Sequence, residues 1–102
     1  MLEAPTSTEK IVIKERSGNV LRVEVIGETH TFGNMLAKEL QSREDVELAY
    51  YVVKHPLIER FELLLRTKPG KDPMEVLVEA MGGLVSKLER LESLIAEGLR
   101  GR

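Results

Sequence analysis

Two kinds of hydrophobic spacing alternate along the chain. The apolar run Ile11-Val12-Ile13 predicts a first strand that ends near Arg16, followed by a turn at Ser17-Gly18-Asn19. From 21 to 25, apolar residues alternate with charged ones, which is the period of a half-buried second strand. Gly and Asn tolerate the backbone angles of tight turns. From Phe32 the spacing becomes helical until about residue 43. Thr31 is the expected N-cap, because its hydroxyl can accept a hydrogen bond from a free N–H of the first turn.

Two further strands and a second helix are predicted after this. The pattern indicates strands at 46–52 and 61–65, with Pro56 of His55-Pro56-Leu57 interrupting the run between them, since proline cannot donate to a β-ladder. A turn at 68–71 follows. Asp72-Pro73 is typical of a helix start, so a helix is expected from Pro73 to about Glu97, with Gly98 ending it.

The order ββαββα predicts an α+β fold with two layers. We expect a four-stranded antiparallel sheet with two helices on one face. Residues 1–9 mix Pro, Ser, Thr and charged residues without periodicity and are expected to form a flexible tail. Residues 10–102 are then one domain.

The last helix carries an apolar seam with steps of three and four residues, which is the a/d spacing of a helix-packing surface. The seam comprises Met74, Leu77, Met81, Leu84, Leu88, Leu91 and Ile95. A helix of the predicted length spans about 37 Å, whereas strands of six or seven residues span only about 20–23 Å. The sheet cannot cover the whole seam, so its C-terminal half, including Leu94, is expected to face a partner.

Composition narrows the functional classes. The chain has 102 residues, 42% of them hydrophobic and 31% charged, a net charge of −2 and no cysteine. Disulfides and thiolate metal sites are therefore excluded, and neither a basic patch nor many aromatic residues indicate nucleic-acid binding. The sequence shows no bilayer-spanning run and no signal peptide, so a cytoplasmic location is expected. Few Asn and Gln residues beside abundant charge are typical of heat-adapted proteins.

His30 is the side chain that most invites a catalytic interpretation. However, no Ser or Cys nucleophile lies in a recognisable elbow, and no acid is placed to orient the imidazole ring. A structural role is favoured for this segment, with Gly33 permitting a close approach and Asn34 tying the turn into the first helix. We expect no catalytic residue, no metal, no cofactor and no small-molecule substrate.

The segment Gly27-Glu28-Thr29-His30-Thr31-Phe32-Gly33-Asn34-Met35-Leu36 resembles the signature of the small alpha-like subunits of DNA-directed RNA polymerase, and specifically archaeal subunit L. His55-Pro56-Leu57 and the acid-proline start of the last helix also fall where that family has them. The resemblance covers about residues 10–98. One departure is Phe32, where the family usually has Leu.

The resemblance implies an alpha-like dimerisation fold and a non-catalytic role in transcription. Family members pair with a larger alpha-like subunit, called D in archaea, and the pair is a platform on which the large catalytic subunits assemble. The implied partner interface consists of Phe32, Met35, Leu36, Leu40, Leu77, Met81, Leu84, Leu88, Leu91 and Ile95. The implied structural motif consists of Glu28, His30, Thr31, Gly33 and Asn34. A self-associating module that uses the same seam to form a homodimer is the alternative, and an enzyme using His30 is a second one.

Overall fold

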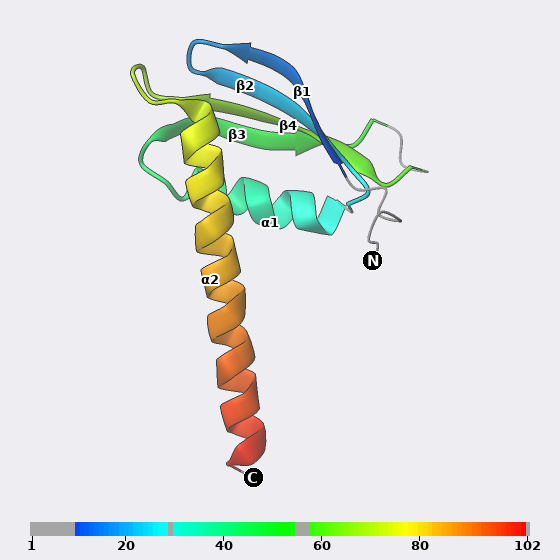
Figure 1. The fold of residues 1–102 in the computed structure, drawn as a ribbon, viewed down its shortest axis with the longest axis vertical. Coiled ribbons are helices and arrows are strands. Elements are labelled where there is room, and N and C mark those ends of the chain that lie inside the picture. The colour runs from blue at the N-terminus through cyan, green and yellow to red at the C-terminus, as the bar shows by residue number, and fades with distance from the viewer. Residues whose placement is uncertain (1–9, 29, 55–57, 102) are drawn as a thin grey trace, which may run out of the picture.

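The elements follow one another in the predicted order. The computed structural model describes residues 10–28, 30–54 and 58–101. The elements are β1 (Lys10–Ser17), β2 (Val20–Ile26), α1 (His30–Gln41), β3 (Val46–Val52), β4 (Arg60–Thr67) and α2 (Pro73–Arg100) (Figure 1). The expected tail at 1–9 and the proline interruption at 55–57 lie outside the described residues.

The strands form one antiparallel sheet in the order β1-β2-β4-β3. Along β2 and β4, buried residues alternate with half-exposed ones, as the period of two predicts. The β1–β2 turn passes through Gly18, whose φ of +56° is favourable for a residue without a Cβ.

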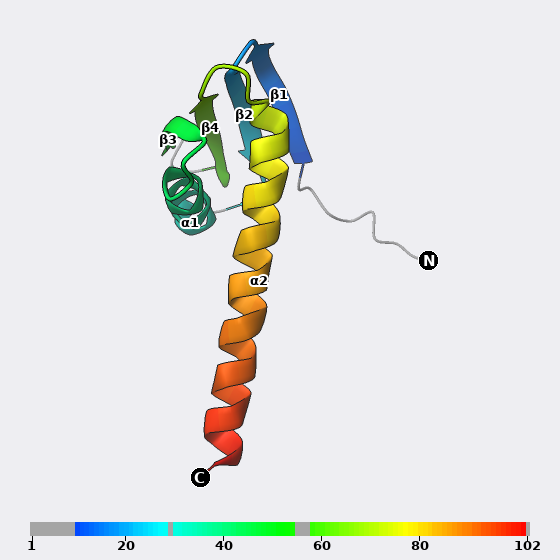
Figure 2. The same ribbon diagram turned by 90° about the vertical axis from the view of Figure 1, so that its left-hand side faces the viewer.

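The core lies on one face of this sheet. Its buried side chains come from every strand except β1 and from both helices: Leu21, Val23, Val25, Leu36, Leu40, Ala49, Phe61, Leu63, Leu65, Val76, Leu77 and Ala80. Both helices therefore cover the same face, as Figure 2 shows. The predicted two-layer α+β fold is confirmed.

The two helices cover that face differently. α1 runs along the strands and packs against β3 and β4. α2 begins beneath the sheet, contacts β2, β4 and α1 with its N-terminal part, and then runs away from the sheet (Figure 1). Neither helix packs extensively on β1, so the inner face of that edge strand is open.

Two predicted helix boundaries are wrong. α1 begins at His30, so Thr31 is its second residue and not its N-cap. The apolar spacing starts only at Phe32 because His30 and Thr31 are both exposed. α2 continues through Gly98 to Arg100, with Gly101 as its C-cap. One glycine costs a helix only about 1 kcal/mol, and here it does not end the element.

Gly33 sets the separation between α1 and the sheet. A Cβ on this residue would lie 3.1 Å from Cδ2 of Tyr51 and 3.3 Å from Cδ1 of Phe61. The two rings already contact each other edge to face, with centroids 5.9 Å apart. A side chain at this position would therefore push the helix off the sheet.

We expect Gly33→Val to destabilise the domain by about 1–3 kcal/mol, because the added methyl groups overpack this contact. Asn34→Val is the matched control: it places the same side chain on the same helix at an exposed position, where the propensities of Asn and Val are similar. Denaturant unfolding followed by circular dichroism measures both. Equal stability of the two variants would contradict the packing role of Gly33.

Candidate partner-docking site

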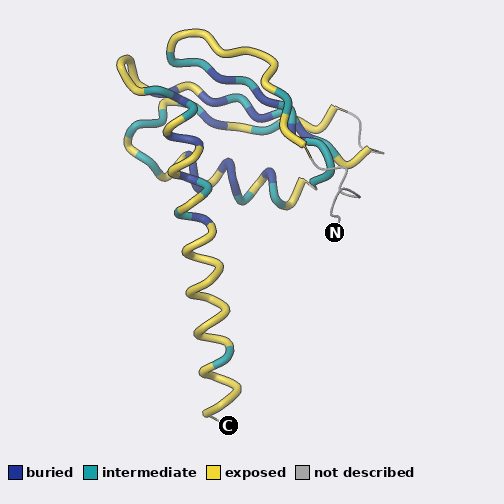
Figure 3. The backbone as a smooth tube through the Cα atoms, viewed as in Figure 1, coloured by how far each residue is buried: buried dark blue, intermediate teal, exposed yellow. Residues whose placement is uncertain are grey.

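The second half of α2 extends beyond its own domain. Leu84 is the last buried residue of the helix, and from Val85 to Arg100 every residue except Ala96 is exposed (Figure 3). We call residues 85–100 the overhang. At 1.5 Å per residue it is about 24 Å long. The sheet therefore leaves the C-terminal half of the seam uncovered, as the length of the helix predicts.

The overhang carries a set of large aliphatic side chains that we call the apolar stripe: Leu88, Leu91, Leu94, Ile95 and Leu99. Their exposed fractions run from 46% for Leu88 to 70% for Leu99. Full burial of such a side chain is favourable by about 1.5–3 kcal/mol. A contiguous apolar surface of this kind is typical of an interaction site.

The implied partner interface divides into buried and exposed residues. Leu36 and Leu40 are 2% and 0% exposed, and Leu77 and Leu84 are also buried, so these four stabilise the chain's own core. They have almost no surface left for a partner, so the accessible part of the implied interface lies in its other residues. Both helices pack on one face of the sheet, and this packing buries the apolar side chains that the helical periodicity identifies.

The remaining implied interface residues keep accessible surface. Phe32, Met35 and Met81 are half-buried, and Phe32 and Met81 pack against the edge of the core. Leu88, Leu91 and Ile95 are exposed members of the apolar stripe.

A polar cluster that the sequence pattern does not predict fixes α2 against α1. Glu39 of α1 is only 7% exposed. Lys87 of α2 donates to its Oε1 at 2.6 Å, and Arg43 donates to its Oε2 at 3.2 Å. The same Nη2 of Arg43 donates to the backbone oxygen of Glu79 at 3.2 Å. We call Glu39, Arg43 and Lys87 the clamp. Its contacts reach α2 at Glu79, before the overhang, and at Lys87, near the start of the overhang.

Gly83 makes room for the clamp. A Cβ there would lie 2.6 Å from Nη2 of Arg43 and 3.1 Å from Oε2 of Glu39, whereas a Cβ on the neighbouring Gly82 would meet nothing within 4 Å. Of the two glycines, only Gly83 is needed for a close approach, that of the Arg43 and Glu39 side chains to α2.

The clamp also changes the acidity of its carboxylate. The hydrogen bond from Lys87 lowers the pKa of Glu39, and the charges of Lys87 and Arg43 act in the same direction against the opposing effect of burial. Glu39 is therefore ionised in the folded chain at neutral pH, which keeps both cations in place.

The residues of the implied structural motif do not form one cluster. Gly33 is buried, Glu28 is half-buried, and His30, Thr31 and Asn34 are exposed on α1. Within the described residues, no group of three or more His, Asp or Glu side chains is arranged to hold a metal ion. In the same part of the chain, no helix has the length and apolarity needed to cross a bilayer.

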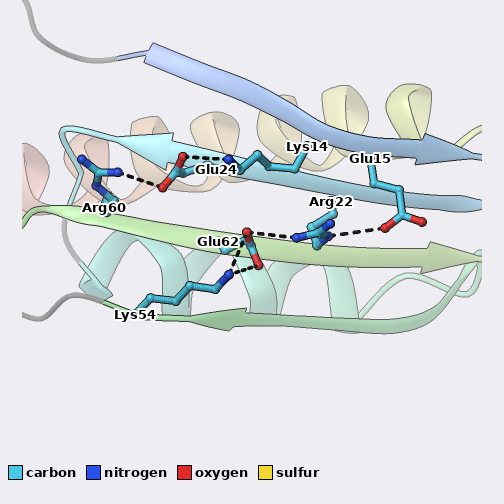
Figure 4. A network of polar contacts seen from close by, with 7 residues as sticks. All are labelled: Lys14, Glu15, Arg22, Glu24, Lys54, Arg60 and Glu62. Carbon is cyan, nitrogen blue, oxygen red and sulfur yellow. Dashed lines mark hydrogen bonds and ion pairs between the residues drawn. The ribbon is translucent and has the colours of Figure 1, made fainter.

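The outer face of the sheet differs from the overhang in being covered with ion pairs. Glu24 is 3.1 Å from Arg60 and 3.8 Å from Lys14. Arg22 lies between Glu15 and Glu62, and Glu62 also contacts Lys54 (Figure 4). Such surface pairs contribute little stability each, but they satisfy the charges of this face internally. The apolar stripe, by contrast, carries five exposed aliphatic side chains.

Fold and site together define an α+β domain with a protruding amphipathic helix. A family model described as the RNA polymerase Rpb3/Rpb11 dimerisation domain matches residues 20–94. This range includes β2 to β4, both helices as far as Leu94, and therefore most of the apolar stripe.

Relatives of known name agree with the family model. DNA-directed RNA polymerase subunit Rpo11 of Korarchaeum cryptofilum is 42% identical over 90 residues, which cover 88% of this chain and 92% of that protein. DNA-directed RNA polymerase II subunit RPB11 of Schizosaccharomyces pombe is 38% identical over 80 residues, covering 78% and 65%. The crystal structure of RNA polymerase subunit L from Thermoplasma acidophilum has the same fold, with a TM-score of 0.79, 24% identity and 92% coverage of each chain. The chain belongs to the family of the RNA polymerase Rpb3/Rpb11 dimerisation domain, and these relatives are Rpo11 and RPB11 subunits of DNA-directed RNA polymerase.

We expect Glu39→Gln to destabilise the chain by about 1–2 kcal/mol at pH 7, since it weakens two charge-assisted hydrogen bonds at a buried site. Because the folded-state pKa of Glu39 is lowered, its contribution is full at neutral pH and is lost as the pH falls through that pKa. The difference from the parent chain should therefore shrink below about pH 4, where unfolded glutamates also take up protons. Urea unfolding across pH 3–7 measures it. Glu89→Gln, at an exposed site on α2, is the control, and a pH-independent gap would contradict this reasoning.

The glycine pair offers a second test of the clamp. Gly82→Ala should stabilise the chain by about 1 kcal/mol, because it improves helix propensity at an open position. Gly83→Ala has the same propensity gain but displaces the guanidinium of Arg43, so it should give no net stabilisation. Thermal unfolding of the two variants measures the difference. Equal gains would show that the clamp does not depend on the space at Gly83.

Proposed function

We propose that this chain is a non-catalytic subunit that pairs with the larger alpha-like subunit of its polymerase, called D in archaea, through the apolar stripe of the overhang. The pair then serves as the platform on which the large catalytic subunits assemble. The observation that carries the proposal is the exposure of the stripe on a helix that protrudes about 24 Å from its own domain.

Energetics support a protein partner. Each member of the stripe is about half exposed or more, so a partner surface gains burial from several large aliphatic groups at once. Fully buried aliphatic clusters of this kind are usual in permanent subunit interfaces. The clamp supports the same function, because it holds the protruding helix at one angle and reduces the ordering needed on binding.

Catalysis is assigned to other subunits in this proposal. His30 is exposed at the start of α1, and we give it no role in chemistry. The expected cytoplasmic location follows from the proposal, since an archaeal polymerase works in the cytoplasm.

The experiment is coexpression of the full chain with the larger alpha-like subunit of the same polymerase, followed by size exclusion with light scattering. A stable 1:1 complex is expected. A chain that forms a stable homodimer and ignores the larger subunit would contradict the proposal and favour the self-associating module.

Leu91→Glu should weaken the complex by at least about 30-fold, because it removes the burial of a leucine and places a charge in an apolar contact. Ser93→Glu is the matched control, with the same new side chain two residues along the overhang, where the helical period of 100° per residue puts it on the opposite side. Titration by calorimetry measures both affinities, and circular dichroism verifies that both variants are folded. Similar losses in the two variants would show that the stripe is not the contact surface.

A further inference from the structure

Two adjacent glycines lie where α2 leaves its own domain. Ala80 is the last residue of the helix in the hydrophobic core cluster, and Gly82 and Gly83 follow it within one turn. Leu84 is buried but lies outside that cluster. Glycine is the least favourable residue of a helix interior after proline, yet the helix continues through both glycines to Arg100. The helix is therefore intrinsically weakest at the boundary between its packed part and the overhang.

Packing explains only one of these glycines. A Cβ on Gly83 would lie 2.6 Å from Nη2 of Arg43 and 3.1 Å from Oε2 of Glu39, so this position has to be small. A Cβ on Gly82 would meet nothing within 4 Å, and an alanine there would favour the helix. What Gly82 has in place of a contact is the freedom of its backbone. Helices commonly bend at small residues of this kind.

The clamp spans the two glycines. One turn before Gly83, the backbone oxygen of Glu79 accepts a hydrogen bond from Arg43. One turn after Gly83, Lys87 donates to the buried carboxylate of Glu39 at 2.6 Å. Arg43 and Glu39 are themselves joined at 3.2 Å. The clamp therefore ties the helix on both sides of the glycines to the C-terminal end of α1.

Two features make the clamp able to open. The side chain of Lys87 is 66% exposed, so water and salt ions compete with Glu39 for its ammonium group. The buried Nε of Arg43 has no hydrogen-bond partner in the part of the chain that the structure describes. A buried donor without a partner lowers the net gain from such a cluster. The clamp thus holds the overhang by a contact that is strong in geometry but accessible to solvent.

We propose that Gly82-Gly83 is a hinge and that the contact between Lys87 and Glu39 is the latch that keeps the overhang in its observed direction. The consequence for pairing rests on the proposed function. A latched overhang presents the apolar stripe in one direction, so less has to be ordered when the partner binds. With the latch open, the overhang points in several directions, and the apparent affinity falls by the fraction of chains that present the stripe correctly.

The test measures the direction of the overhang in the isolated full chain. Because the chain has no cysteine, Asn34→Cys on α1 and Ser93→Cys on the overhang, both at exposed positions, can be spin-labelled selectively. Double electron–electron resonance then gives the distribution of distances between the two labels, with unlabelled chain added so that only distances within one molecule are read. Asn34→Cys with Glu75→Cys is the control pair, since Glu75 is exposed on α2 before the glycines.

Lys87→Met opens the latch, because it keeps the aliphatic stem of the side chain and removes the ammonium group. We expect it to broaden the 34–93 distribution at least about twofold and to leave the 34–75 distribution unchanged. Arg90→Met removes a cation from an exposed position on the next turn and should change neither distribution. Gly82→Ala, added to Lys87→Met, should restore most of the narrow 34–93 distribution, because alanine stiffens the hinge.

An unchanged 34–93 distribution in Lys87→Met overturns the latch, and a broad one that Gly82→Ala does not narrow overturns the hinge. Broadening of both label pairs indicates a general loss of packing and also contradicts the proposal. None of these measurements involves the partner, so they can fail while the parent chain still pairs with the larger alpha-like subunit.

The consequence for pairing is measured by calorimetry with the larger alpha-like subunit. Lys87→Met should lower the apparent affinity about threefold to tenfold, and Gly82→Ala should recover most of that loss in the double variant. A loss that Gly82→Ala does not recover would contradict the hinge as its cause. If the parent chain itself forms no complex, the proposed function fails, while the distance measurements still decide whether the hinge and latch exist.

Discussion

The structure depends on a mismatch of length between its last helix and its sheet. α2 has 28 residues, about 42 Å, while the strands have seven or eight and lie across the direction of the helix. A sheet of this size can bury only the first part of such a helix, up to Leu84. The chain thus completes its core early and leaves a second, separate apolar surface. Because the buried part of α2 ends at Leu84, α1 packs inside the chain and the overhang stays accessible.

Much of the fold could be read from spacing, because each element carries a clear period. The alternation in β2 and β4 and the Asp72-Pro73 start of α2 indicate their elements directly. The helix boundaries were less certain: His30 and Thr31 precede the apolar spacing, and Gly98 resembles a stop but has helical neighbours on both sides. Hydrophobic periodicity predicts which residues face an apolar surface. It cannot locate a helix end whose residues face only water.

The division of the apolar seam into buried and exposed residues was predictable in part for the same reason. The apolar spacing of α1 and α2 is identical for a side chain buried in the core and one buried by a partner, so Leu36 and Leu40 could not be distinguished from Leu91 by pattern alone. On α2, the length of the helix relative to the strands distinguished the buried residues from the exposed ones. For α1 no such comparison of lengths was possible. The clamp was missed because Glu39, Arg43 and Lys87 are ordinary helix-surface residues in sequence, and only the crossing of two helices brings them together.

The apolar stripe also affects the fate of a copy that has no partner. An orphan chain displays five large aliphatic groups along a single exposed helix, and such surfaces are what chaperones and proteases recognise. In the proposed complex, pairing covers the stripe and removes that signal. In that proposed role the stripe also limits the surplus of the chain, so that the amount of free subunit in the cell follows the supply of its partner.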